Sequence, residues 1–216
     1  MKRAVIVALT GAWLIAVSAP ARAETTKDSK VLKERSLATL LDFAKSRPTR
    51  IEAALALGKS GDPSVIPPLV ELLGRTSGKL RQAIDTALAG LDAAGYIAKD
   101  LDSEQPPVRA RATFQLMLLK TPKLAPRLIE IAKNDPDPEV RENAVSTLTA
   151  WDEASALDAY LWILANDAVP KVRSAAAQGL ARIDDPAARA GLQAALTNEP
   201  DAFVKYFIRK SMRSEK

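Results

Sequence analysis

The chain has 216 residues and a formal net charge of +5, and it has neither cysteine nor histidine. This composition excludes disulfide bonds, cysteine nucleophiles, a serine–histidine catalytic pair and a zinc site of histidine and cysteine ligands. The length suits one domain with a substantial core, which side-chain packing alone must stabilise.

Residues 1–23 have the pattern of a secretory signal peptide. Lys2 and Arg3 precede an apolar stretch over residues 4–19, and Ala21-Arg22-Ala23 places small residues where signal peptidase reads them. A retained membrane anchor is the alternative, but this stretch of 16 residues is shorter than the roughly 20 that a spanning helix needs. We therefore predict cleavage after Ala23, no stable membrane insertion afterwards, and a periplasmic or secreted protein of a Gram-negative bacterium.

Cleavage changes the charge balance of the chain. The signal peptide would remove three basic residues and no acidic one, which leaves 28 basic and 26 acidic residues and a net charge of +2. Nucleic-acid-binding domains have a stronger basic balance. Charge and export both argue against nucleic acid as the partner.

The segment after the signal peptide is predicted to lead into a cap. Residues 24–29 are polar and predicted to be disordered, and residues 30–47 are assigned to an N-terminal capping helix with Leu37, Leu40 and Phe43 among its apolar residues. Because the terminal units of a repeat stack present one polar side to solvent, this helix is expected to cover the open end of the repeats that follow.

Residues 48–216 contain six copies of a unit of about 32 residues. A recurring pair, mostly an apolar residue followed by a basic one, sets the register, with steps of 31, 28, 32, 32 and 32 between the basic residues. The units start near residues 48, 79, 107, 139, 171 and 203. The basic residues of the pairs are Arg50, Arg81, Arg109, Arg141, Arg173 and Lys205.

Each unit is predicted to be a hairpin of two helices. In the fourth unit, Val140, Ala144, Leu148 and Trp151 are spaced 4, 4 and 3 residues apart, which is one face of an α-helix. A turn, often Asp-Pro, follows, and then a second apolar helix. No stretch alternates as a β-strand does. A single hairpin cannot bury its apolar face, so we predict an all-α fold, an α-solenoid of stacked antiparallel helix hairpins.

The repeat resembles one known family. The segments Val172–Leu180 and Ile51–Pro63 are similar to the short HEAT repeats first described in phycobilisome lyases, and the resemblance covers about residues 48–213. It implies that the first helices line the convex side and the second helices the concave, ligand-facing side. It also implies that the basic residues of the register form a ladder between units.

Two interpretations of these basic residues are open. A column of cations could bind a polyanion. The structural alternative, which we favour, is that each basic side chain pairs with an acid near the preceding turn, such as Asp137 or Asp201, and links neighbouring units.

Four residues of the second helices are candidates for binding. Trp162 falls where the register places Glu130 in the third unit, so an exposed tryptophan could anchor a partner; partial burial is the alternative. Tyr160 aligns with core positions, with its hydroxyl expected to reach outward. Arg127 and Glu130 share one helix face and could belong to a polar binding surface or be ordinary solvated charges.

The sequence contains no catalytic constellation, and we predict neither an enzyme, nor a metal site, nor a cofactor. The leading interpretation is a protein-binding scaffold or assembly module of the cell envelope, with another protein of unknown identity as its partner. One alternative, implied by the resemblance, is an enzyme or cofactor-handling protein related to phycobilin lyases. Another is a nucleic-acid-binding protein similar to HEAT-like DNA glycosylases.

Overall fold

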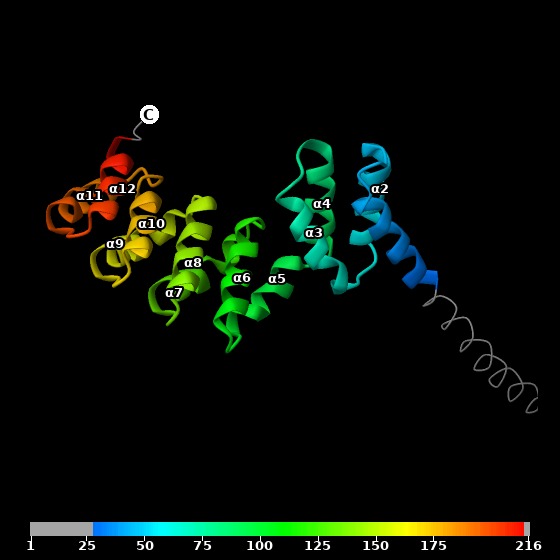
Figure 1. Ribbon diagram of the computed structural model, residues 1–216, viewed down its shortest axis with the longest axis horizontal. Coiled ribbons are helices and arrows are strands. Elements are labelled where there is room, and N and C mark those ends of the chain that lie inside the picture. The colour runs from blue at the N-terminus through cyan, green and yellow to red at the C-terminus, as the bar shows by residue number, and fades with distance from the viewer. Residues whose placement is uncertain (1–27, 214–216) are drawn as a thin grey trace, which may run out of the picture. The chain divides into compact units, whose positions relative to one another are not determined.

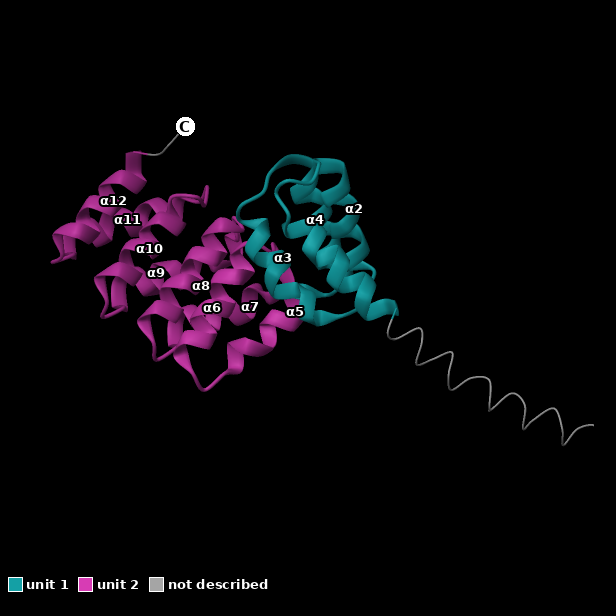
Figure 2. Ribbon diagram, turned by 45° about the vertical axis from the view of Figure 1, so that its right-hand side comes forward, with its two compact units in different colours: residues 1–93 teal, residues 94–216 magenta. Residues whose placement is uncertain are grey.

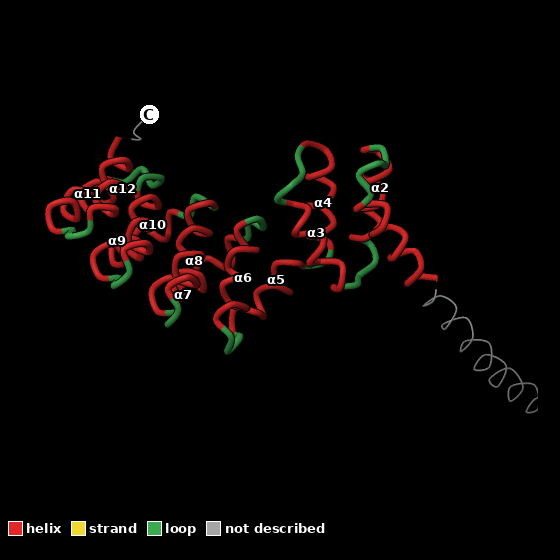
Figure 3. Tube along the Cα trace, in the orientation of Figure 1, coloured by secondary structure: helices red, strands yellow, loops and turns green. Residues whose placement is uncertain are grey.

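The computed structural model describes residues 28–213 (Figure 1). The predicted signal peptide and residues 24–27 lie outside this range. Residues 28–41 are helical, so the prediction of disorder is wrong for residues 28 and 29, and the cap helix ends at residue 41 instead of 47. Helices joined by short loops make up the described part, which contains no strand (Figure 3) and no helix long and apolar enough to cross a membrane.

Six helices carry the register of the repeat. Each begins one residue before the unit start expected from the sequence, and Pro at the first turn of four of them fits a helix start, where a backbone N–H has no partner in any case. The six are α2 (Arg47–Gly58), α4 (Gly78–Gly90), α6 (Pro106–Met117), α8 (Pro138–Ala150), α10 (Pro170–Leu180) and α12 (Ala202–Arg213).

A second helix follows in each of the first five units. These are α3 (Ile66–Leu73), α5 (Ala93–Ala98), α7 (Ala125–Asn134), α9 (Leu157–Asn166) and α11 (Pro186–Asn198). Short 3-10 turns lead into three of them: η1 (Pro63–Val65), η3 (Pro122–Leu124) and η4 (Ala154–Ala156). In the second unit α5 is brief and passes into η2 (Lys99–Asp102), which accounts for the shortened step between Arg81 and Arg109.

The turns are capped by the acidic residues that the sequence places there. Asp62 and Asp185 each accept a hydrogen bond from the backbone N–H two residues later, and Asp137 accepts two, from Glu139 and Val140. These carboxylates satisfy N–H groups that a helix start leaves without a partner. The Asp-Pro turns therefore act as predicted, as helix N-caps.

The described chain forms two compact units, divided between Ala93 and Ala94 (Figure 2). In the N-terminal unit α2 packs along α4. In the C-terminal unit α6, α8, α10 and α12 pack side by side in chain order as one layer, and α7, α9 and α11 form a second layer. Within the C-terminal unit this is the predicted stack of helix hairpins.

The predicted core column is buried. Val140, Ala144, Leu148 and Trp151 are at most 2% exposed. The Trp151 indole donates a hydrogen bond to the Leu116 carbonyl at 3.2 Å, so its one polar atom is satisfied inside the core. The column therefore fills the hairpin of the fourth repeat, and Trp151 also ties this repeat to the third.

The cap segment differs from its prediction on its outer side. Leu40 is fully buried, but Val31, Leu32 and, just after the helix, Phe43 are between 61% and 73% exposed. The expectation of a polar outer side at this end is therefore wrong. Charged residues such as Lys30 and Glu34 flank the exposed apolar ones.

Candidate binding surface

The exposed side of the second-helix layer presents Trp162. In α9 the side chains of Tyr160, Ile163 and Leu164 are buried, so Trp162 points away from the core and is 42% exposed. The Lys133 ammonium from α7 lies 5.1 Å from the centre of the indole ring. This cation–π contact holds a large flat apolar surface at the border of two units, facing solvent.

Tyr160 does not belong to this surface. Its side chain is 1% exposed, and its hydroxyl lies 3.2 Å from the Thr149 hydroxyl inside the hairpin. Burial raises the pKa of Tyr160 to about 12, because a phenolate is poorly solvated there. The expected outward reach of the hydroxyl is wrong; the core position predicted from the alignment is confirmed.

Arg127 and Glu130 lie on the second-helix layer but have local partners. Arg127 forms an ion pair with Asp102 of η2 at 2.5 Å. Glu130 is exposed and accepts a hydrogen bond from the Asn134 amide one turn later. The structure does not join them to Trp162 through a direct contact; Lys133 on the same helix makes that contact.

A groove that sequence reasoning missed runs between α9 and α11. It has a volume of about 540 Å³, and Leu161, Ala165 and Ala194 are among the residues of its wall. The two helices come close at Gly191, where an added Cβ would lie within van der Waals overlap of Leu161. Alanines at this spacing were visible in the sequence, but their pairing across two helices was not.

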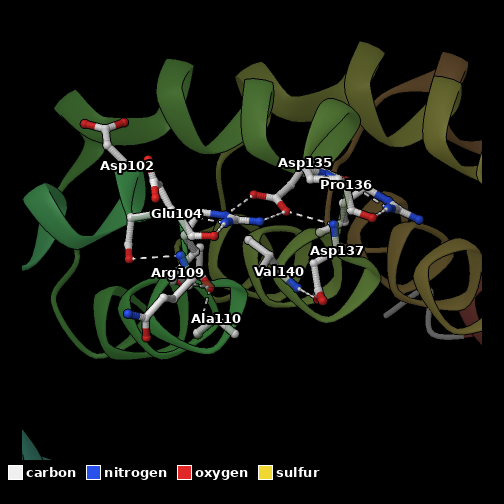
Figure 4. Close-up of polar contacts among 12 residues, drawn as sticks. Asp102, Glu104, Arg109, Ala110, Asp135, Pro136, Asp137 and Val140 are labelled. Atoms are coloured by element: carbon white, nitrogen blue, oxygen red, sulfur yellow. Dashed lines mark hydrogen bonds and ion pairs between the residues drawn. The ribbon is translucent and has the colours of Figure 1, made fainter.

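A buried ion-pair ladder lies along one edge of the C-terminal unit. Arg109, Arg141 and Arg173 each hold a carboxylate 26 residues later with two hydrogen bonds of 2.7–3.0 Å. The partners are Asp135, Asp167 and Glu199, whose side chains are 3–7% exposed. Figure 4 shows the first of these pairs, with Arg109 facing Asp135.

Each rung joins three successive segments. The Arg141 guanidinium donates to the Asp135 and Pro136 carbonyls of the preceding loop and to the Asp167 carboxylate of the following one. Asp167 in turn accepts the Val169 backbone N–H. The arginines therefore link units, as favoured from the sequence, and they are not a free cation column for a polyanion.

The predicted partners of the arginines are wrong. The sequence pointed to Asp137 and Asp201, but both accept backbone hydrogen bonds as helix caps. The preceding loop contributes carbonyl groups, and the acid comes from the following loop. An acid that recurs at one fixed offset after each of the three arginines was the signal in the sequence that could have identified the pairs.

The ladder covers three of the six register positions. The same offset from Arg50 and Arg81 leads to Thr76 and Pro107, which have no carboxylate. Arg50 instead donates to the Leu40 carbonyl, and Arg81 to the Leu73 carbonyl. Within residues 28–213, the Lys205 ammonium has no hydrogen-bond or ion-pair partner.

The last rung predicts an acid sensitivity. The Arg173 hydrogen bonds lower the pKa of Glu199 below its ordinary value of 4.5. Because the folded-state pKa is lowered, the ion pair stabilises the protein above pH 4.5, and this stabilisation is lost as the pH falls through the lowered pKa. In thermal unfolding, Glu199→Gln is expected to lower the Tm at neutral pH and to reduce the Tm difference between about pH 6 and pH 3. An unchanged difference would contradict this assignment.

Residues 28–213 contain no cluster of three or more His, Cys, Asp or Glu side chains that could bind a metal ion. The acidic residues noted above are occupied as helix caps and ladder partners. The other features described for this part of the chain are the exposed Trp162 indole and the groove between α9 and α11.

A stack of helix hairpins tied by a buried arginine ladder defines an α-helical repeat protein. The sequence profile of HEAT repeats matches residues 96–159 and 125–213, and that of PBS lyase HEAT-like repeats matches residues 49–75. The HEAT-repeat matches span more than half of the chain, which belongs to the HEAT-repeat family. No curated protein matches it in sequence.

A solved structure supports the same fold. A chain in the complex of CpcE and CpcF of phycocyanin lyase from Nostoc is 24% identical, with a TM-score of 0.53 over 69% of this chain and 99% of that one. Human deoxyhypusine hydroxylase, in complex with glycerol, is 22% identical, with a TM-score of 0.48 over 83% and 72%. A designed armadillo repeat protein is 19% identical, with a TM-score of 0.41 over 82% and 97%.

Proposed function

We propose that this protein is an exported HEAT-repeat module that binds another protein through the second-helix surface around Trp162. The exposure of Trp162 carries the proposal. A 42% exposed indole is costly to leave in water, and tryptophan is a frequent hot-spot residue of protein interfaces. The HEAT-repeat scaffold is suited to this role because its rigid layers hold the ring at a fixed place.

The groove between α9 and α11 extends the proposed surface. Leu161, next to Trp162 in the chain, lies in its wall together with Ala165 and Ala194. The groove wall also contains Asp167, Arg173 and Glu199. A partner side chain with an apolar stem and a polar end would therefore fill this groove while its neighbours cover the indole. The phycocyanin lyase chain with the same fold was solved in a complex of two chains, which is a precedent for HEAT repeats that work in a protein pair.

Crosslinking tests the proposed surface directly. A photoreactive residue at position 162 is expected to crosslink one defined protein in intact cells, whereas the same residue at position 114, where Phe114 on α6 is 53% exposed, is not. Trp162→Ala is expected to abolish co-purification of that protein with only a small change in Tm, because the ring is 42% exposed and its cation–π contact lies outside the core. Equal crosslinking from both positions would refute the assignment of this surface.

Export is the second part of the proposal and rests on the signal-peptide pattern of residues 1–23. The mature protein is expected in the periplasm or outside the cell, in the envelope of a Gram-negative bacterium, with Glu24 as its first residue. Amino-terminal sequencing of the protein from fractionated cells tests this point. A cytoplasmic protein that begins at Met1 would exclude a role in the envelope.

A further inference from the structure

The last described helix has an unusual outer face. Phe203 and Tyr206 of α12 are 51% and 59% exposed. With Phe207 they form an edge-to-face cluster, with ring centres 4.8 and 5.2 Å apart, and the Lys210 ammonium lies 5.9 Å from the Phe207 ring. Spacings of three and four residues place these side chains on one stripe of the helix.

The aromatic stripe is specific to this helix. In α10 the register places Lys171, Ser174 and Ala175 where α12 has Phe203, Tyr206 and Phe207. The inner side of α12 needs none of these rings, because Val204 and Ile208 fill the core there and are fully buried. Packing of the repeat therefore gives no reason for the two exposed rings, Phe203 and Tyr206.

Charge is concentrated on the same helix. α12 has four basic residues, Lys205, Arg209, Lys210 and Arg213, and no acidic one. The preceding part of the C-terminal unit, residues 94–201, has 12 basic and 16 acidic residues and a net charge of −4. An anionic surface would attract α12 and repel the rest of this unit, so the charge distribution favours one orientation.

From this face we propose that α12 docks the protein on the surface of a bilayer that contains anionic phospholipids. Aromatic rings prefer the boundary between headgroups and acyl chains, and lysine and arginine bind the anionic headgroups beside them. The stripe lies on the outer side of a helix that is packed into the stack by its other side. It would enter the interfacial layer without unfolding.

Another repeat unit is a poor occupant of this face. A unit stacked on α12 as α12 stacks on α10 would bury Tyr206 and Arg209 at the positions of Ser174 and Ala177, which are at most 3% exposed in α10. The small residues there allow close helix contact, whereas a tyrosine and an unpaired buried arginine charge would prevent it. An acidic protein remains as a competitor, and the experiment below separates it from the bilayer.

Sedimentation with vesicles tests the proposal. The full mature protein is expected to bind vesicles of phosphatidylcholine and phosphatidylglycerol, and to remain in solution with phosphatidylcholine alone. Phe203→Ser with Tyr206→Ser is expected to weaken binding roughly tenfold, and Lys210→Gln, which removes the cation beside the Phe207 ring, about fivefold. Phe114→Ser is the matched control, because it removes an aromatic ring of similar exposure from α6.

Two results would overturn the proposal. One is an absence of binding to the anionic vesicles. The other is binding that Phe114→Ser weakens as strongly as the double variant on α12 does. If the protein ignores vesicles but binds soluble polyglutamate in a manner that depends on Phe203 and Tyr206, the face belongs to an acidic protein partner. Trp162→Ala is expected to leave vesicle binding unchanged, so this test is independent of the proposed protein-binding surface.

Discussion

We expect Gly58→Val to lower the free energy of unfolding by about 3 kcal/mol. A Cβ atom at Gly58 would lie 2.5 Å from the Ala87 Cα and 2.9 Å from its Cβ. The obstacle is the backbone of α4, which cannot rotate away as a flexible side chain would. Helices α2 and α4 would have to separate along their main contact in the N-terminal unit, and the apolar residues between them would lose their packing.

Chemical denaturation measures the effect, with Gly90→Ala as the control. Gly90 ends α4 in the same unit, and its added Cβ would meet the Gly58 carbonyl oxygen at 3.4 Å, an ordinary contact distance. Alanine also has the higher helix propensity, so Gly90→Ala is expected to be neutral or slightly stabilising. Equal destabilisation by the two variants would show that glycine at position 58 has no special role.

Sequence periodicity was sufficient to predict the layers of helices, because equivalent positions are buried in each repeat. Val140, Ala144 and Leu148 recur at a fixed spacing since each faces the same neighbours in each hairpin, and the structure places all three in the core. The first and last residues of the helices were harder to predict from the sequence. The sequence pattern did not separate the 3-10 turns η3 and η4 from the helices α7 and α9 that follow them.

The candidate surface could be predicted only in part. The register of the repeat indicated that Trp162 lies outside the core, because its equivalents are Glu130 and Ala194. The contact with Lys133 and the groove beside Leu161 join residues on different helices, and a one-dimensional pattern does not give those distances. The outward hydroxyl expected for Tyr160 failed for a local reason: Thr149 offers it a polar partner inside the hairpin.

The arginine ladder could also be predicted only in part from the sequence. Its cations were identified from the register, but the acids were sought on the wrong side of each arginine. The helix caps Asp137 and Asp201 are nearer in sequence, and proximity along the chain favoured them. The three-dimensional stack instead brings the following loop to each guanidinium.

Removing one guanidinium from the ladder is expected to destabilise the protein by about 3–5 kcal/mol. Arg141→Met keeps much of the apolar stem but leaves Asp167, whose side chain is 3% exposed, without its cation. It also leaves the Asp135 carbonyl without a donor. A buried carboxylate that keeps only the Val169 N–H as a partner is the dominant cost, because water cannot replace the hydrogen bonds lost from Arg141.

Arg182→Ala is the control that separates burial from distance. Arg182 and Asp152 are 2.5 Å apart, closer than Arg141 and Asp167 at 2.7 Å, but both side chains of the first pair are 54% exposed. Since solvent screens an exposed pair, its loss is expected to cost at most about 1 kcal/mol. Equal losses for the two arginines, measured by denaturant unfolding, would show that burial does not govern the strength of the rungs.

A double variant tests whether the unpaired charge itself is responsible. Asp167→Asn removes the charge and keeps an oxygen that can accept the Val169 N–H, as Asp167 does at 2.9 Å. Arg141→Met combined with Asp167→Asn is therefore expected to recover about 2 kcal/mol of the loss caused by Arg141→Met alone. Strict additivity of the two substitutions would instead place the cost in the lost carbonyl contacts of Arg141. The ladder arginines would then stabilise the fold through their hydrogen bonds to loop carbonyls, and the carboxylates would contribute little.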